Sequence, residues 1–345
     1  MICDDSAVIR GAIARLLEAD PAVRVVARVA DGQAAIAELR RTPVDVIVLD
    51  IEMPVLDGLS ALPRLLKVDP GVRVIMASTL TTRGADIALR ALRLGAADYV
   101  PKPSALSLAG DRGFQRELLE KVKGLARLRR GAAAPQAASG IALRAAGTLP
   151  ARLLAIGSST GGPQALFTLV QALGPRLPLP VVLTQHMPAS FTPILATHLS
   201  KIGGLPCTEA RDGEVLAPGH LYLAPGDRHL LIEGGASLRA RLSADPPENF
   251  CRPAVDPMLR SANTACAGRV LVAMLTGMGH DGLAGTRAVV EAGGTAIAQD
   301  EASSVVWGMP GAIARAGLCH AVLPLARIAP KLLDMLTQAR RGAPA

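Results

Sequence analysis

Residues 152–163 read Arg-Leu-Leu-Ala-Ile-Gly-Ser-Ser-Thr-Gly-Gly-Pro, a short apolar run followed by a glycine-rich turn that carries three hydroxyl side chains. This pattern predicts a buried strand, a tight turn and the start of a helix. A serine in such a turn is exposed above the end of a parallel sheet, where it can act as a nucleophile. A glycine-rich loop at a helix N-terminus can equally bind phosphate or simply turn the chain. The stretch alone leaves both interpretations open.

The composition is typical of a globular protein of about two domains, since the 345 residues are 50% hydrophobic and 19% charged. Aromatic residues make up only 2%, which argues against a nucleic-acid surface built on stacked bases. The net charge of +8 carries little information, because the chain is rich in Arg throughout. The five cysteines form no CxxC pair, so we expect neither zinc nor disulfides. We therefore expect a cytoplasmic protein without membrane insertion or a nucleic-acid partner.

Both halves of the chain alternate short β-branched runs with helical patterns, which predicts two α/β domains with doubly wound parallel sheets. We expect a flavodoxin-like domain over residues 1–125, a linker over 126–150 that is rich in Arg, Ala, Gly and Pro, and a Rossmann-like domain over 151–345. The strands expected are 24–29, 44–49, 72–77 and 98–100 in the first domain, and 153–156, 181–185, 220–224, 229–232, 270–276 and 295–298 in the second.

Polar side chains follow the strands of the first domain. Asp4 and Asp5 lie where a first strand should end, Asp50 and Ser78 end two later strands, and Lys102 follows the last. The carboxyl ends of parallel strands meet at one edge of a sheet. Three carboxylates gathered there would repel one another without a cation, and Mg²⁺ is the natural candidate. Such a cation would offset the charge of a phosphoryl group on Asp50, whose oxygens the lysine and the hydroxyl could hold.

The motifs of this half resemble the receiver domain of bacterial response regulators. They are Asp4-Asp5-Ser6, Leu49-Asp50-Ile51-Glu52-Met53-Pro54 with Asp57-Gly58, and Tyr99-Val100-Pro101-Lys102-Pro103. The resemblance implies that Asp50 is the phosphoacceptor, that Asp5 binds the metal with help from Asp4, that Ser78 is the switch hydroxyl and that Lys102 contacts the phosphoryl group.

One departure concerns the first strand. Receiver domains have a full apolar strand before the paired aspartates, whereas this chain has only Met1-Ile2-Cys3 there. That strand would be central in the sheet, and its loss would leave two neighbours unpaired. We expect a longer native N-terminus. A chain that is truly this short should form a poorly stable receiver domain with weakened phosphorylation.

A nucleophilic serine requires a base and an orienting carboxylate, and two other strand ends of the second domain supply them. His186 follows the strand that begins at Val181, and Asp281 lies in a glycine-rich turn after the strand over 270–276. Both should therefore share a sheet edge with Ser159. Residues 157–161 also match the G-x-S-x-G turn of α/β-hydrolases, whose chain order would select Ser159, Asp281 and His320. His320 begins an apolar run, however, and should lie at the opposite edge.

The second half resembles the catalytic domain of the chemotaxis protein-glutamate methylesterases over essentially its whole length. The resemblance implies that Ser159 is the nucleophile, His186 the general base and Asp281 its orienting carboxylate. It also implies an oxyanion hole formed by the backbone amides of Met278 and Thr160, and no cofactor in this site. The motifs that carry it are residues 156–163, 185–188, 191–192, 223–226, 275–282, 298–303 and 308–310.

The order of receiver, linker and methylesterase implies a phosphorylation-activated serine hydrolase of bacterial chemotaxis. Its substrates would be methylated chemoreceptors, from which it releases methanol by acyl transfer, and it would also deamidate receptor glutamines. A chemotaxis histidine kinase would be the phosphodonor. The alternative is a phosphorylation-switched binding protein with a silent second domain. A DNA-binding regulator is not favoured, because a glycine-rich α/β pattern follows the linker in place of a helix-turn-helix.

Overall fold

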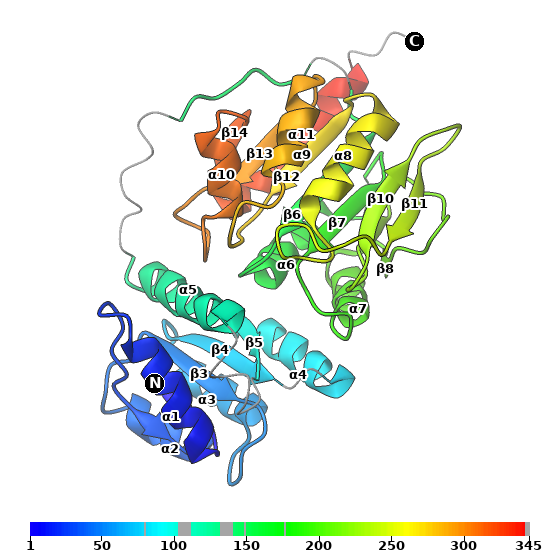
Figure 1. Cartoon of the computed structure of the whole chain (residues 1–345). Coiled ribbons are helices and arrows are strands. Elements are labelled where there is room, and N and C mark those ends of the chain that lie inside the picture. Colours follow the sequence, from blue (N-terminus) through cyan, green and yellow to red (C-terminus); the bar gives the residue numbers. More distant parts are fainter. Residues whose placement is uncertain (79–80, 103–111, 132–140, 148–149, 176, 342–345) are drawn as a thin grey trace. The chain divides into compact units, whose positions relative to one another are not determined.

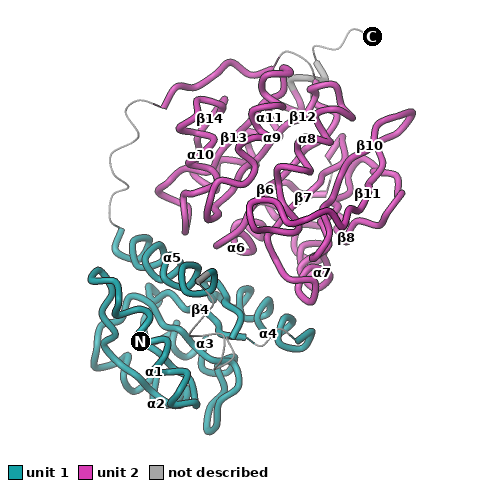
Figure 2. Tube along the Cα trace, viewed as in Figure 1, with its two compact units in different colours: residues 1–133 teal, residues 134–345 magenta. Residues whose placement is uncertain are grey.

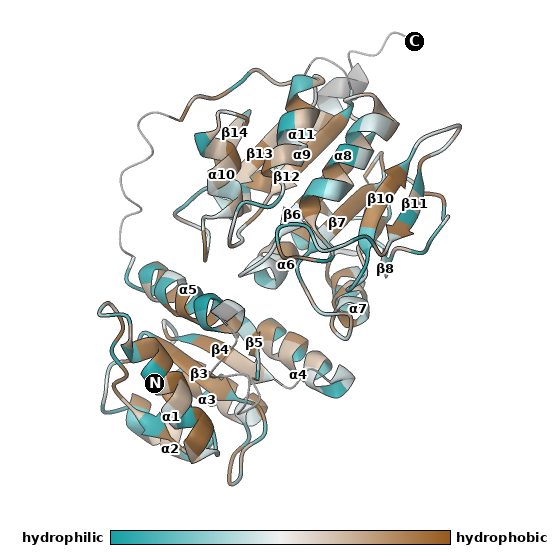
Figure 3. Ribbon diagram, viewed as in Figure 1, coloured by the Kyte–Doolittle hydropathy of each residue, from teal (hydrophilic) through white to brown (hydrophobic). Residues whose placement is uncertain are grey.

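The computed structural model describes residues 1–78, 81–102, 112–131, 141–147, 150–175 and 177–341. The chain divides into two compact units, Met1–Ala133 and Ala134–Ala345 (Figure 2). Hydrophobic residues concentrate in the strands of both units, and polar residues lie on the outer faces of the helices (Figure 3). Among the described helices, none has both the length and the apolar character that crossing a membrane requires.

Unit 1 is a five-stranded parallel sheet in the order β2-β1-β3-β4-β5, flanked by helices (Figure 1). Four of its helices have an N-cap residue whose side chain accepts a hydrogen bond from a backbone N–H of the first turn. These residues are Ser6, Asp31, Asp57 and Thr81. The strands are β1 (Ile2–Cys3), β2 (Arg28–Val29), β3 (Val46–Asp50), β4 (Arg73–Ser78) and β5 (Asp98–Pro101); the helices are α1 (Ala7–Glu18), α2 (Gly32–Leu39), α3 (Gly58–Val68), α4 (Thr82–Arg93) and α5 (Arg112–Arg129).

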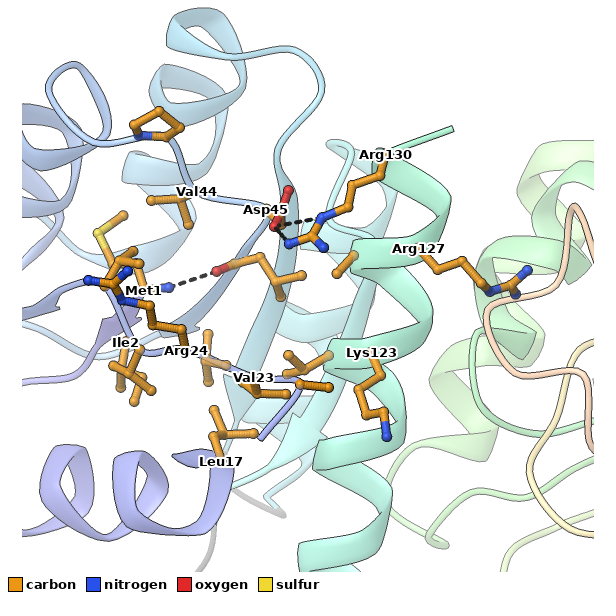
Figure 4. A pocket seen from close by; sticks show the side chains of 18 residues that line it. Met1, Ile2, Leu17, Val23, Arg24, Val44, Asp45, Lys123, Arg127 and Arg130 are labelled. Carbon is orange, nitrogen blue, oxygen red and sulfur yellow. Dashed lines mark hydrogen bonds and ion pairs between the residues drawn. The ribbon is translucent and has the colours of Figure 1, made fainter. Parts of the chain in front are cut away.

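The strand predicted over residues 24–29 forms only at Arg28–Val29, which corrects the prediction. The neighbouring strand β1 has only two residues, Ile2 and Cys3. They pair with Arg28 and Val29, so the pairing between β1 and β2 includes no earlier residue. Residues 24–26 line a cavity of about 550 Å³ in place of pairing with a neighbouring strand (Figure 4). A strand needs a neighbour for its backbone N–H and C=O groups, so this segment stays irregular.

Met1 lines the same cavity, and its ammonium group donates a hydrogen bond of 2.8 Å to the carbonyl oxygen of Val46. Burial lowers the pKa of this amino group to about 6. Most of the lining is apolar, including Leu17, Val23 and Val44, with Lys123 of α5 and Arg130 just after this helix also at the cavity (Figure 4). The cavity thus lies between β1, the segment before β2 and the end of α5.

A buried lysine ties α5 to the sheet of unit 1. Lys121 is 3% exposed, and its Nζ lies 2.7 Å from Oε1 of Glu117 and 3.3 Å from Oδ2 of Asp98, which is buried in β5. Burial would lower the pKa of Lys121, but the two carboxylates outweigh it and raise that pKa. Breaking a buried ion pair is strongly destabilising. We expect Lys121→Ala to lower the free energy of unfolding of unit 1 by about 3 kcal/mol, measured by urea unfolding followed by circular dichroism.

Lys123 on the same helix is the matched control. Its Nζ lies 2.9 Å from Oδ2 of Asp20, but the two side chains are 41% and 20% exposed. Lys123→Ala should therefore lower the free energy of unfolding of unit 1 by less than about 1 kcal/mol. Trp307, the single tryptophan of the chain, lies in unit 2, and its fluorescence should report unfolding of that unit. Equal losses for the two lysine variants would contradict the expectation.

Unit 2 is built on a seven-stranded parallel sheet in the order β14-β13-β12-β6-β7-β9-β8. Helix α6 packs on α7 and α11, and α8 packs on α9, which gives a helical layer on each face (Figure 1). The strands are β6 (Leu153–Ser158), β7 (Val181–Gln185), β8 (Cys207–Glu209), β9 (Leu221–Leu223), β12 (Val270–Met274), β13 (Thr295–Gln299) and β14 (Ala321–Leu323); the helices are α6 (Gly162–Leu173), α7 (Thr192–Gly203), α8 (Val255–Cys266), α9 (Leu283–Glu291), α10 (Met309–Arg315) and α11 (Leu325–Arg341). Both sheets confirm the predicted fold class.

One predicted strand of the second domain belongs to a separate ribbon. Residues 229–232 lie in β10 (His229–Glu233), which pairs antiparallel with β11 (Arg239–Ser243) and packs on α8. The segment between these strands is too short for the crossover that a parallel pair needs, so the two strands form a hairpin.

The predicted linker is structured where it is described. Its first residues belong to α5, which runs to Arg129. Toward its other end, the N–H of Arg144 donates to the carbonyl oxygen of Cys319, and the N–H of Gly147 donates to Thr295 Oγ1 at 2.8 Å. Residues 141–147 are therefore bound to unit 2. Residues 132–140 and 148–149 of the predicted linker lie outside the described residues.

Candidate functional site

Three neighbouring strand ends of unit 2 bring Ser159, His186 and Asp281 to one edge of the sheet. β6 lies between β7 and β12, and these central strands are buried throughout. Beyond the strands, the N–H of Ser159 donates to the carbonyl oxygen of Thr276 at 3.0 Å, and the N–H of His186 donates to that of Ser158 at 3.2 Å. The loops that carry the predicted residues are thus fastened together.

The turn after β6 requires its glycines. Gly161 has a φ of +74°, and a Cβ there would lie 2.5 Å from Cγ2 of Val305. A Cβ on Gly162 would lie 1.9 Å from Oε1 of Gln185. The two glycines therefore allow the backbone to approach Val305 and Gln185 closely. The resulting tight turn places Ser159 between β6 and α6.

The two adjacent serines have different environments. Ser158 ends β6, is fully buried and donates to Oε1 of Gln185 at 2.7 Å. Ser159 is half-buried, and Nε2 of Gln185 donates to its carbonyl oxygen at 2.9 Å. Ser159 is therefore the serine whose hydroxyl can meet a substrate. Gln185, which positions both residues, received no role from the sequence.

His186 and Asp281 form a short hydrogen bond, 2.7 Å from Nε2 to Oδ2. Asp281 is 2% exposed, and its carboxylate also accepts from the N–H groups of Val255, Asp256 and Gly282 and from Nδ2 of Asn249. Burial would raise the pKa of Asp281, but the His186 bond and the backbone donors hold it below its usual value.

The same carboxylate controls the imidazole. Burial would lower the pKa of His186, but the bonds to Asp281 and Cys251 raise it to about 10. Because Asp281 accepts a hydrogen bond from Nε2–H, Nδ1 is the ring nitrogen that is left to accept a proton. Nδ1 lies 3.4 Å from Sγ of Cys251. Among the residues that the structure describes, no hydrogen bond joins the Ser159 hydroxyl to the ring.

The two predicted oxyanion amides lie next to Ser159. A Cβ on Gly277 would meet the Cβ of Ser159 at 3.0 Å, so the loop that contains Met278 lies against the serine. Oγ1 of Thr276 donates to the carbonyl oxygen of Thr160 at 2.9 Å and fastens the two loops. Within the described part of the chain, the N–H groups of Thr160 and Met278 donate to no protein group.

His320 lies away from this edge. It precedes β14, its N–H donates to the carbonyl oxygen of Ala296, and its Nδ1 lies 3.1 Å from the carbonyl oxygen of Arg144. This position excludes the alternative order Ser159, Asp281, His320.

Sequence reasoning missed three residues around the carboxylate: Asn249, Cys251 and Asp256. Nδ2 of Asn249 bridges Asp281 and Asp256 at 2.9 and 3.0 Å. Asp256 also accepts from the N–H of Gly285, while burial, together with the charge of Asp281, raises its pKa. The only sequence signal was their position just before or within α8, which no motif marks.

In unit 1 the predicted acidic cluster forms at the ends of β1 and β3. Ligand oxygens of Asp4, Asp5 and Asp50 lie within 4.8 Å of one another, with Asp4 and Asp50 buried. Nζ of Lys102 lies 2.6 Å from Oδ2 of Asp50 and 3.4 Å from Oδ2 of Asp4. Burial raises the pKa of Asp50 against the opposing effect of Lys102. The buried Oδ2 of Asp4 accepts no hydrogen bond from the described residues, so it fits the role of a cation ligand.

Ser78 lies at the end of β4, beside this cluster. It is buried, and it lines a small cavity together with Asp50, Glu52 and Lys102. Its Oγ donates to the carbonyl oxygen of Gly84 in the first turn of α4 at 2.8 Å. The hydroxyl must therefore leave Gly84 before it can donate to another acceptor.

Comparison with known proteins identifies a family for each unit. Residues 154–332 match the CheB methylesterase family, and residues 1–108 match the response regulator receiver domain. A protein-glutamate methylesterase/protein-glutamine glutaminase of Paramagnetospirillum magneticum is 51% identical over 97% of this chain and 95% of its own length. One of Azospirillum brasilense is 53% identical over 98% of this chain and 93% of its own length.

A solved structure matches unit 2. The catalytic domain of Thermotoga maritima CheB methylesterase is 39% identical, with a TM-score of 0.53, and the match covers 54% of this chain and 100% of that domain. The two family matches fall on the two units that the structure separates. The chain therefore belongs to the CheB methylesterase family and joins its catalytic domain to a response regulator receiver domain.

Proposed function

We propose that this protein-glutamate methylesterase and protein-glutamine glutaminase acts on chemoreceptors in chemotaxis adaptation, with Ser159, His186 and Asp281 as its catalytic residues. The observation that carries the proposal is the 2.7 Å bond between His186 and a buried Asp281 at the sheet edge that also bears Ser159. A histidine held by a carboxylate at the same sheet edge as a half-buried serine is the arrangement that activates a serine nucleophile.

The reaction is acyl transfer. Nδ1 of His186 takes the proton of the Ser159 hydroxyl as Oγ attacks the γ-carbonyl carbon of a glutamate methyl ester. The N–H groups of Thr160 and Met278 bind the charge that develops on the carbonyl oxygen. The imidazolium then gives its proton to the leaving group, which departs as methanol. Water, deprotonated by the same ring, hydrolyses the acyl-enzyme to free glutamate. On a glutamine amide the leaving group is ammonia, and the product is again glutamate.

The receiver domain controls this reaction. A chemotaxis histidine kinase donates a phosphoryl group to Asp50, and the kinase is thus the second partner of the protein. Asp4, Asp5 and Asp50 would hold a Mg²⁺ ion, which would offset the negative charge of the incoming phosphoryl group, while Lys102 and Ser78 contact the oxygens of that group. Phosphorylation of Asp50 shifts the equilibrium between two states of the receiver domain, and the rate of the esterase follows that equilibrium.

The direct test is methanol release from methylated receptors with and without a small phosphodonor such as acetyl phosphate. Release by the chain, increased by the phosphodonor, supports the proposal. Receptor binding without any release of methanol would favour a catalytically silent binding protein. Ammonia release from receptors that carry glutamine tests the deamidase activity in the same way.

Asp50→Ala should abolish stimulation by the phosphodonor and leave the unstimulated rate of methanol release, because Asp50 belongs to unit 1 and the esterase residues belong to unit 2. Removal of Mg²⁺ with a chelator should have the same effect on the wild-type chain. The measurement is the ratio of rates with and without acetyl phosphate. Stimulation of Asp50→Ala equal to that of the wild type would contradict this account of the control.

A further inference from the structure

The catalytic histidine has a second nucleophile beside it. Sγ of Cys251 lies 3.4 Å from Nδ1 of His186, and Oδ2 of Asp281 lies 2.7 Å from Nε2 of the same ring. Thiol, imidazole and carboxylate therefore stand in series, as they do when a histidine activates a cysteine. The role of His186 as a base rests on the function proposed above.

The loop that carries Cys251 is held firmly. Glu248 and Cys251 exchange two backbone hydrogen bonds of 2.9 and 3.1 Å around the residues between them. Glu248 forms two bonds to the guanidinium group of Arg260, and Nδ2 of Asn249 donates to Asp281. The carboxylate that orients the imidazole thus also anchors the loop that presents the thiol.

Cys251 also differs from the other cysteines in its exposure. Cys3, Cys207, Cys266 and Cys319 are buried, whereas Cys251 is half-buried. Burial raises the pKa of the thiols of Cys3, Cys207 and Cys319 to about 12, which keeps them protonated and unreactive. Cys251 alone combines access to solvent with contact to a base.

We propose that Cys251 is a reactive thiol that shares the base His186 with Ser159, and that peroxides switch the esterase off through it. Nδ1 takes the thiol proton, and the thiolate attacks one oxygen of hydrogen peroxide. An S–O bond forms as the O–O bond breaks, and the leaving hydroxide takes the proton from the imidazolium and departs as water. The sulfur is oxidised to sulfenic acid and the peroxide is reduced. The hydroxyl of the sulfenic acid forms a hydrogen bond with Nδ1 of His186. This nitrogen can then no longer take the proton of Ser159.

The first experiment measures reactivity without using the esterase. The full-length chain is treated briefly with iodoacetamide at pH 6, and each cysteine is quantified by peptide mass mapping. We expect Cys251 to be alkylated at least tenfold faster in the wild type than in His186→Gln, because only the wild type has an imidazolium beside the sulfur that stabilises the thiolate. Ser159→Ala should keep the fast rate. The four buried cysteines should label slowly in every variant, which also verifies that His186→Gln is folded.

The second experiment measures the switch. Hydrogen peroxide should remove methanol release in step with the formation of sulfenic acid at Cys251, trapped with dimedone, and dithiothreitol should restore the activity. For Cys251→Ser, the rate of methanol release should be the same before and after treatment with peroxide at concentrations that inactivate the wild type. This comparison holds whatever the rate of the untreated variant is.

Alkylation of Cys251 at equal rates in the wild type and His186→Gln would overturn the proposal, as would equal sensitivity of Cys251→Ser to peroxide. The proposed function fails by a different result, namely methanol release by Ser159→Ala. The labelling rate of Cys251 does not depend on Ser159, so the two failures are distinguishable.

Discussion

Ser159→Ala should lower methanol release from methylated receptors by about 10⁴-fold or more, because the acyl-enzyme cannot form without the hydroxyl. The serine is half-buried and lies in a turn whose backbone is fixed by Gly161 and Gly162, so its replacement should leave the fold unchanged. The measurement is the rate constant with phosphodonor present, so that control by the receiver domain does not limit the reaction.

Ser158→Ala is the matched control. The hydroxyl of Ser158 is buried and bonded to Oε1 of Gln185, so its loss should cost about 1–3 kcal/mol of stability. Methanol release should persist, because this hydroxyl ends a strand and has no path to a substrate. A Ser159→Ala variant that still releases methanol at the rate of Ser158→Ala would identify another nucleophile, and the proposed mechanism would be wrong.

Much of the site could be predicted because parallel sheets collect their functional residues at strand ends. The β-branched runs before Ser159, His186 and Asp281 are local signals, and the topology then brings these three together without further information. The same reasoning predicted the cluster of Asp4, Asp5 and Asp50. In both units, local patterns were sufficient because each functional residue lies at the end of a strand or in the loop that follows it.

The residues that sequence reasoning missed reach the site from irregular backbone. Asn249 and Cys251 lie in a turn between β11 and α8, and their contacts with Asp281 and His186 depend on how that turn folds back over the sheet edge. No periodic pattern encodes such a path. The error over residues 24–27 has another cause, because a strand-like composition forms no strand where the neighbouring strand is only two residues long.

Asp281→Asn should lower methanol release by about 10⁴-fold. Oδ2 of Asp281 accepts hydrogen bonds from both Nε2 of His186 and the N–H of Val255. The carboxylate oxygen accepts from both of these donors. An amide nitrogen in its place is itself a donor and could accept from neither. The imidazole would then have to keep its proton on Nδ1 and accept at Nε2. With the proton on the wrong nitrogen, the ring cannot deprotonate Ser159.

The pH dependence separates this effect from a general loss of structure. Asp281 raises the pKa of His186, which lies at about 10. Without the carboxylate the pKa must fall, so the neutral base persists to lower pH. The rising limb of the pH–rate profile of Asp281→Asn should therefore move to lower pH even though its maximum falls. Asp256→Asn is the control, because Asp256 contacts Asn249 and Gly285 but not the imidazole, and its limb should stay in place. An unshifted limb in Asp281→Asn would show that another group sets the protonation of the base.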